Sequence, residues 1–209
     1  MNLEKQHVIK LIGYASGIAA NNIDCALGPW HMYYHQDLFN TLGFQVEWET
    51  IVKASTTQKG INVMPLVIKI VTELGLAVMP LAKNNEPFCV FGGDHSSAMG
   101  TWSAVAHANR HRGDIGLIWI DAHMDCHTPN TSETQNIHGM PLAHLLGEGN
   151  SDLTHLFDHM PAIKPENLCL VGIRSYEPEE KKILNRLGIN IFQMDAINQH
   201  GLPDILEKA

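Results

Sequence analysis

The sequence has 209 residues and a mass of 23.2 kDa, with 44% hydrophobic and 17% charged residues. This is enough apolar material for one sizeable core, and a charged fraction below the roughly 25% of an average protein argues against disorder. Fourteen basic against 22 acidic side chains give a net charge of −8. That charge disfavours a nucleic-acid binder or a membrane-surface protein, because both rely on basic surfaces. Because no signal segment and no apolar run of about 18 residues is evident, we expect a cytoplasmic protein.

Short apolar runs alternate with longer stretches of helical periodicity along the whole chain. Strands are predicted at residues 7–14, 44–49, 87–91, 114–120, 167–173 and 189–193. Helices are predicted at residues 29–41, 62–83, 96–110, 139–146 and 178–187, with a further helix after Asp195. Several strand runs, such as 115–120, are apolar throughout, which is typical of parallel strands covered on both faces. The pattern predicts one α/β domain over residues 1–209, a three-layer sandwich with a mainly parallel sheet between helices.

Candidate metal ligands follow two of the predicted strands. Asp121, His123 and Asp125 come directly after the run that ends at Ile120, and in an extended chain their side chains would point the same way. Gly92-Gly93-Asp94-His95 follows another strand, where glycine permits a sharp turn or a close approach. In parallel sheets, functional groups gather at the carboxyl ends of the strands, so we expect these segments to meet.

This donor set has two readings. Asp121, His123 and Asp125 could be polar loop residues that end a strand, but their spacing next to a second strand ending in GGDH favours a metal site. Carboxylate and imidazole donors favour Mn²⁺, Mg²⁺ or Zn²⁺ over soft ions, and Asp121 has two oxygens with which to bridge two ions. His138 precedes Gly139 in a turn before a helix; near the metal site it becomes a candidate proton shuttle, although alone it is a common turn residue.

Taken in order, the segments GGDHS (92–96), DAHMD (121–125) and HGMP (138–141) resemble the ureohydrolase family of arginases, agmatinases and related amidine hydrolases. Gly28-Pro29 and the segment 171–175 agree with this resemblance, and residues 127–132 are more similar to the arginases than to the agmatinases. The resemblance implies an arginase/deacetylase-like fold and two Mn²⁺ ions per site. It also implies a small guanidino substrate, no nucleic-acid or membrane partner, and a homotrimer or homohexamer when the chain is full length.

The resemblance also implies residue roles. His95 and Asp125 would bind one ion, His123 the other, and Asp121 would bridge them. A bridging hydroxide would attack the guanidinium carbon, and His138 would help to protonate the departing amine; Asp125 and His138 are thus the candidate catalytic residues.

For the substrate, the resemblance places His127, Thr134 and Glu177 where arginases hold the α-amino and α-carboxyl groups. Animal arginases have Asn, Ser and Asp there, so hydrogen-bonding capacity is kept while reach and charge change. Glu177 also lies where an acidic residue favours the start of the following helix. We expect hydrolysis of L-arginine to ornithine and urea; agmatine or another guanidino or formimino compound is the alternative substrate.

The family's second metal motif, S-x-D-x-D-x-x-D-P, is absent from these 209 residues. We therefore expect a chain truncated at its C-terminus, with an apolar, unpaired strand edge. One ion would keep three ligands and the other only two. The alternative hypothesis is consequently a catalytically inactive fragment that acts only as a binding module.

Overall fold

The computed structural model describes residues 8–20 and 22–209. Its strands are β1 (Ile9–Ala15), β2 (Val46–Lys53), β3 (Phe88–Gly92), β4 (Leu117–Ile120), β5 (Leu168–Ile173) and β6 (Asn190–Gln193). Its α-helices are α1 (Leu27–Tyr34), α2 (Asp37–Thr41), α3 (Met64–Lys83), α4 (Ser97–Asn109), α5 (Pro141–Leu145), α6 (Ser151–Thr154), α7 (Pro178–Arg186), α8 (Met194–His200) and α9 (Leu202–Leu206). Single 3₁₀ turns cover Ile23–Ala26, Gly60–Val63, Arg110–Arg112, Ile137–Gly139 and Pro165–Asn167.

All six predicted strands are present, with shifted ends; residue 7, the first of the predicted strand 7–14, lies outside the described residues. The predicted helix 29–41 is wrong as a single element. His35 leaves the helical region at φ −114°, ψ 27°, so α1 ends there and α2 follows separately. The helix predicted after Asp195 is likewise divided, because Gly201 adopts a φ of 84° between α8 and α9. The short helix α6 was not predicted.

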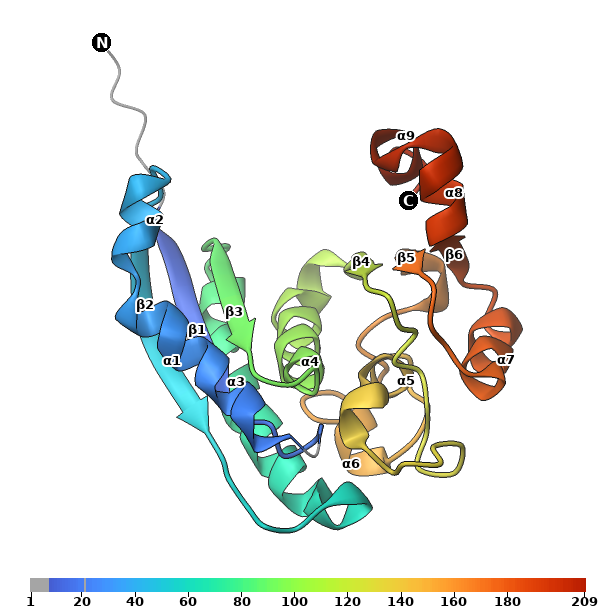
Figure 1. The fold of residues 1–209 in the computed structure, drawn as a ribbon, viewed down its shortest axis with the longest axis horizontal. Helices are drawn as coiled ribbons and strands as arrows, with labels where there is room; N and C mark the ends of the chain where they lie inside the picture. The colour runs from blue at the N-terminus through green and yellow to red at the C-terminus, as the bar shows by residue number, and fades with distance from the viewer. Residues whose placement is uncertain (1–7, 21) are drawn as a thin grey trace.

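Every strand pair in the described residues is parallel, which confirms the α/β prediction. The hydrogen-bonded ladders form two three-stranded sheets, β2-β1-β3 and β4-β5-β6, where the sequence predicted one sheet. Figure 1 shows the two sheets on either side of α4, the helix that connects β3 to β4 through a short turn and loop.

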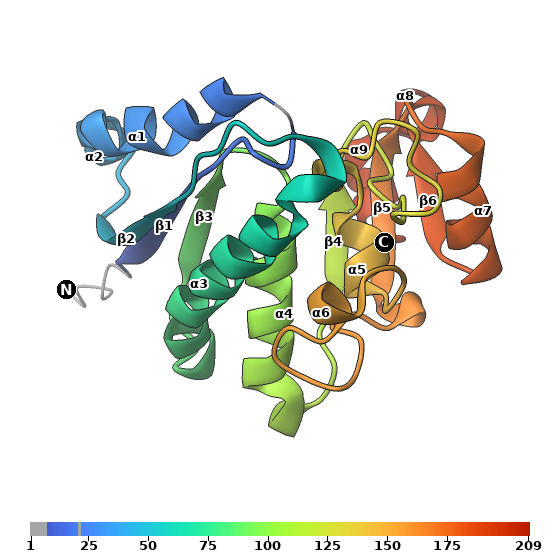
Figure 2. The ribbon, with the colours of Figure 1, turned by 90° about the horizontal axis from the view of Figure 1, so that it is seen from below.

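Helices cover both faces of the first sheet. Figure 2 shows α1 and α2 on one face and α3 on the other. The α3 side chains at Val67, Val71, Leu74 and Val78 recur at helical spacing and pack against Ile12 and other buried residues in one core. Together with the 3₁₀ turn before it, α3 is long and apolar enough to cross a membrane, contrary to the sequence expectation. One face of this helix lies in the core of the first sheet.

The central strand of the second sheet, β5, is buried along its whole length. Leu168 and Leu170 face a core shared with α4, α5 and α7, whereas Cys169 and Val171 face a smaller core shared with α8 and α9. This alternation explains the continuous apolar run, since a strand covered on both faces has no solvent side.

The edge of β3 away from β1 and the edge of β4 away from β5 have no strand partner within the described residues. A groove of ≈ 770 Å³ runs beside β3 and α4, lined by Phe88, Val90 and Trp102 among others. On β4, Ile118 and Ile120 are 48% and 69% exposed. The expected apolar, unpaired strand edge is therefore found at β4.

Candidate metal and substrate site

The turn after β3 carries His95 to the carboxyl edge of the first sheet. Gly93 donates its N–H to the carbonyl of Tyr14 at 2.8 Å, and Asp94 donates its N–H to the carbonyl of Ser16 at 2.9 Å. A Cβ on Gly93 would lie 2.1 Å from the Ser16 carbonyl oxygen, so only glycine fits there. The predicted close approach of backbone is thus confirmed at this glycine.

Asp94 supports this turn from inside the protein. Its Oδ1 accepts hydrogen bonds from the backbone N–H and the hydroxyl of Ser96, and its Oδ2 accepts one from the N–H of Ala19 at 3.1 Å. Burial raises the pKa of Asp94 above its usual value, against the opposing effect of these hydrogen bonds. Because both oxygens are engaged, Asp94 orders the backbone beside His95.

The segment after β4 bends instead of continuing as a strand. Asp121 still donates its N–H to Val171 at 3.1 Å, but the N–H of His123 turns back to Asp121 Oδ1 at 2.8 Å, and Asp125 adopts a φ of 45°. The chain is therefore not extended here, which was the condition for 121, 123 and 125 to point the same way. Met124 and Asp125 are both buried, and Asp121, His123 and Asp125 still line one cavity. A positive φ at a residue other than glycine is strained, and such strain is common at functional sites.

Three of the four predicted ligands form one cluster. His95 Nδ1 lies 2.5 Å from Asp125 Oδ2 and 3.3 Å from Asp121 Oδ2, and one donor atom from each of these residues lies within 4.8 Å of the others. Burial by itself lowers the pKa of His95, but the hydrogen bond that its ring donates to Asp125 and the nearby carboxylate charges outweigh it, so the net shift is upward. The fourth residue, His123, lies outside this cluster, with its Nδ1 3.2 Å from Asp121 Oδ1.

The chemistry of this cluster fits a hard or borderline divalent ion. It offers one imidazole nitrogen and two carboxylates, and the nearest thiol in sequence, Cys126, is fully buried. Within residues 8–20 and 22–209 this is the one group of three or more such donors. His123 and the second oxygen of Asp121 are the donors left for another ion beside it.

His138 lies beside the cluster on a segment tied to the DAHMD loop. Leu142 donates its N–H to Asp125 at 2.9 Å, and His127 donates its N–H to Gly139 at 3.0 Å. The Nδ1 of His138 lies 3.2 Å from the carbonyl of Ala19, which can only accept. Neutral His138 therefore carries its proton on Nδ1, which leaves Nε2 as a base.

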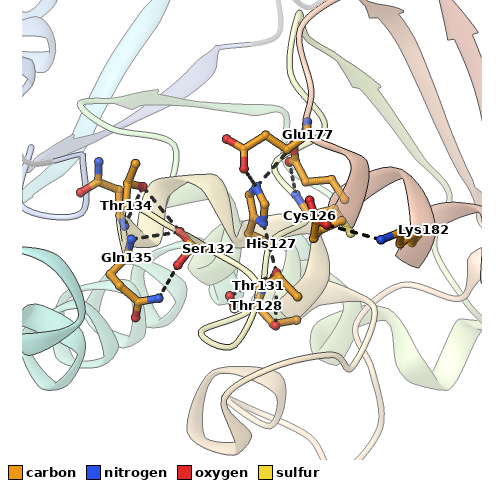
Figure 3. Close-up of polar contacts among 12 residues, drawn as sticks. Cys126, His127, Thr128, Thr131, Ser132, Thr134, Gln135, Glu177 and Lys182 are labelled. Atoms are coloured by element: carbon orange, nitrogen blue, oxygen red, sulfur yellow. Dashed lines mark hydrogen bonds and ion pairs between the residues drawn. The ribbon is translucent and has the colours of Figure 1, made fainter.

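The residues predicted to hold the substrate lie on the loop that follows and on α7 (Figure 3). The Nδ1 of His127 contacts the Thr131 hydroxyl at 3.1 Å, and its Nε2 contacts Glu177 at 3.1 Å. Thr134 Oγ1 accepts the N–H of Asn136 at 3.3 Å and lies 3.5 Å from the Ser132 hydroxyl. Gln135, at a φ of 58°, donates to the carbonyls of Pro129 and Ser132 and so fixes the loop.

Glu177 occupies the N-cap position of α7, which confirms its predicted place at the start of that helix. It also lines the cavity, and its contact with a substrate stays a prediction. Sequence reasoning missed its neighbour Glu180. This side chain is 5% exposed, and its oxygens accept the N–H groups of Cys126 at 3.0 Å and of Glu177 at 2.8 Å. Glu180 thereby fastens α7 to the DAHMD loop. The signal for it is the capping-box spacing of an acidic residue three positions after the N-cap.

All eight predicted site residues line one cavity of ≈ 480 Å³. They are His95, Asp121, His123, Asp125, His127, Thr134, His138 and Glu177. Ser132, Asn136, Ser175, Tyr176 and Glu180 share this lining and were not predicted. The site therefore combines a cation-binding cluster with a rim of hydroxyl, carboxylate and imidazole groups.

Comparison with known proteins agrees with this arrangement. The profile of the Arginase family matches residues 8–209. The arginase of Staphylococcus aureus (strain COL) is 32% identical over 215 residues, which cover 98% of this chain and 70% of that protein. The crystal structure of the Bacillus caldovelox arginase superposes with a TM-score of 0.85 at 32% identity, covering 97% of this chain and 70% of that one. The Entamoeba histolytica arginase in complex with L-ornithine gives a TM-score of 0.88 at 27% identity, with coverages of 97% and 70%.

These matches span nearly the whole chain, and they agree with the motifs that line the cavity. The chain therefore belongs to the arginase family.

Proposed function

We propose that this site binds Mn²⁺ and hydrolyses the guanidino group of L-arginine to ornithine and urea. The observation that carries the proposal is the single cavity in which His95, Asp121 and Asp125 face the rim residues His127, Thr134 and Glu177. Similarity to an arginase with bound L-ornithine supports the substrate class.

The cluster would hold one ion through His95, Asp121 and Asp125, and His123 would hold a second beside Asp121. Bound divalent ions supply Lewis-acid activation of water at neutral pH. The residues of this chain do the rest. His138 accepts and returns a proton at Nε2, because its Nδ1–H is engaged by Ala19, and the departing amine is the group that needs this proton.

The rim favours an amino-acid substrate over a simple amine. Glu177, 54% exposed in its side chain, presents a carboxylate that attracts the α-ammonium group. The Thr134 hydroxyl, 3.5 Å from the Ser132 hydroxyl, would donate to the α-carboxylate, a group that agmatine lacks. Arginine should therefore be preferred to agmatine.

The test measures Mn²⁺ per chain after metal loading and removal of loose ions, followed by urea release from arginine and from agmatine. We expect two ions per chain, faster turnover of arginine, and loss of both binding and activity in His95→Asn. The matched control is His111→Asn, an exposed histidine outside the cavity, which should change neither.

Thr134→Val tests the substrate assignment separately. Removing a hydrogen bond to a charged group should raise the KM for arginine about tenfold and leave that for agmatine unchanged. Equal effects on the two substrates would remove the α-carboxylate role of Thr134. One ion or none per chain, without urea release, would contradict the hydrolase proposal and favour a binding module.

A further inference from the structure

Trp119 lies against the metal cluster without belonging to it. It is the third residue of β4, two positions before Asp121, and only 4% of it is exposed. Its indole ring stacks on the imidazole of His95, with the ring centroids 4.5 Å apart and the planes inclined by 22°. A residue of the second sheet thus covers one face of a ligand carried on the turn after the first sheet's β3.

The stacking explains an orientation that the His95 backbone alone does not fix. An imidazole can turn about two side-chain bonds, and only one orientation directs Nδ1 toward both Asp121 and Asp125. The His95 side chain is 38% exposed, so the surrounding protein encloses it only in part. Contact with a flat, immobile ring fixes the plane of the imidazole, because tilting it would break the stack or drive it into the indole. Within that plane, the hydrogen bond from Nδ1 to Asp125 selects the edge that faces the cluster.

Packing holds Trp119 itself in place. Its backbone pairs with Leu170 of β5, and its side chain belongs to the core of the second sheet together with Leu117 and Ala98. The indole Nε1 is buried and has no hydrogen-bond partner within the described part of the chain. Burying an unpaired N–H is unfavourable. Apolar packing, and not a polar contact of the indole, therefore holds the Trp119 ring in this position.

We propose that Trp119 is a positioning residue for the metal centre: its indole fixes the His95 imidazole so that Nδ1 points to the ion shared with Asp121 and Asp125. The inference rests on the proposed metal site, but it concerns a residue that neither binds the ion nor touches the substrate. Residues that orient metal ligands commonly contribute 10- to 100-fold to metal affinity.

The test compares Trp119→Leu, which removes the ring, with Trp119→Phe, which keeps an aromatic face. Trp48→Phe is the matched control, because Trp48 also has a buried, unpartnered Nε1 but packs in the first sheet against Tyr33 and Phe91. In the metal-free chain, NMR should show the His95 ring protons shifted upfield by the indole. This shift should vanish in Trp119→Leu, decrease in Trp119→Phe and persist in Trp48→Phe.

Mn²⁺ affinity, measured by equilibrium dialysis, is the second readout. We expect the dissociation constant to rise about tenfold in Trp119→Leu and by less than threefold in Trp119→Phe, with no change in Trp48→Phe. Thermal unfolding of the metal-free chains separates a general loss of stability from this effect. If the leucine variant does not fold, the quenching of tryptophan fluorescence by bound Mn²⁺ replaces it as the test. This quenching should persist in Trp48→Phe and largely disappear in Trp119→Phe.

The outcomes separate this inference from the proposed function. A wild-type chain that binds no Mn²⁺ would overturn both. An upfield shift that survives in Trp119→Leu, or is lost there while Mn²⁺ binds as tightly as before, would overturn the positioning role alone. A loss of quenching in Trp119→Phe no larger than that in Trp48→Phe would also overturn it, since the Trp119 indole would then not be the ring beside the ion.

Discussion

The two sheets are built from the same kind of parallel unit but from elements of different length. The first sheet has strands of seven, eight and five residues and packs on α3, a helix of 20 residues. The second has strands of four, six and four residues, and α7, with nine residues, is the longest helix after β4. Long loops therefore make up much more of the second half.

This difference matches the distribution of the site. His95 is the one predicted site residue that comes from the first half, whereas the other seven come from the segments after β4 and β5. Loops can place polar groups in orientations that regular helices and strands do not allow, provided that hydrogen bonds hold them. Here Glu180 and Gln135 hold the loop segments that carry Asp125, His127 and Thr134.

The two halves share one helix. Met99 and Ala104 of α4 belong to the core of the first sheet, and Ala98 belongs to the core of the second. We therefore expect the two cores to unfold together, despite their separate strand ladders.

The largest expected effect on stability comes from removing one large side chain from each core. Leu74 and Leu170 are both fully buried, in the first and the second core respectively. Leu74→Ala and Leu170→Ala should each lower the free energy of unfolding by about 3 kcal/mol, through lost burial and the cavity left behind. Urea titrations followed by tryptophan fluorescence and by circular dichroism measure the change.

Leu42→Ala is the control, because Leu42 is 69% exposed and its loss should cost less than about 0.5 kcal/mol. Two separate transitions in either core variant would show that the halves unfold independently, against the shared role of α4.

The next test concerns the close packing of α3 and α4. A Cβ on Gly100 would lie 2.1 Å from the carbonyl oxygen of Val71, so Gly100→Ala forces the helices apart. We expect a loss of about 2 kcal/mol, within the usual range for overpacking. Gly116→Ala is the matched control, since its Cβ would meet the Asn167 carbonyl at an ordinary 3.8 Å. Equal stabilities of the two variants would show that α4 moves freely against α3.

The parallel fold could be predicted from the sequence because buried strands leave a clear signal. The run that ends at Ile120 and the run that ends at Ile173 are apolar throughout, and both are strands beside the site. The division into two ladders was not predictable, since strand order depends on contacts between distant residues. Ile118 and Ile120 illustrate this, because their apolar character predicted burial and yet they are exposed at an unpaired edge.

The residues that form the site could be predicted from the sequence as well as the fold could, but their geometry could not. DAHMD and GGDH identified residues that do line one cavity. The chain bends after β4, and His123 is not part of the three-residue cluster. No spacing rule for an extended strand contains that bend. Trp119 was not singled out because an aromatic residue within an apolar strand is usually a core residue, and its contact with His95 crosses from one sheet to the other.

The smallest predicted effect tests how the second half holds its loops. His144 of α5 is 1% exposed; its Nδ1 donates to the Met140 carbonyl at 2.8 Å, and its Nε2 accepts the N–H of Asn150 at 3.2 Å. Only the neutral ring can make both bonds, and burial lowers the pKa of His144 despite the bond to Met140.

Below about pH 6.5 the unfolded chain therefore binds a proton at His144 that the folded chain resists, so acidification destabilises the fold. One such group can change the free energy of unfolding by at most about 1.4 kcal/mol per pH unit. Urea titrations at pH 7 and pH 5.5 should show a smaller loss in His144→Gln than in the wild type. His155 is exposed, and His155→Gln should behave as the wild type does. An identical loss of unfolding free energy in all three chains would mean that the segment from α5 to Asn150 opens readily enough for His144 to be protonated in the folded protein. The second half would then be held by its sheet and not by its loops.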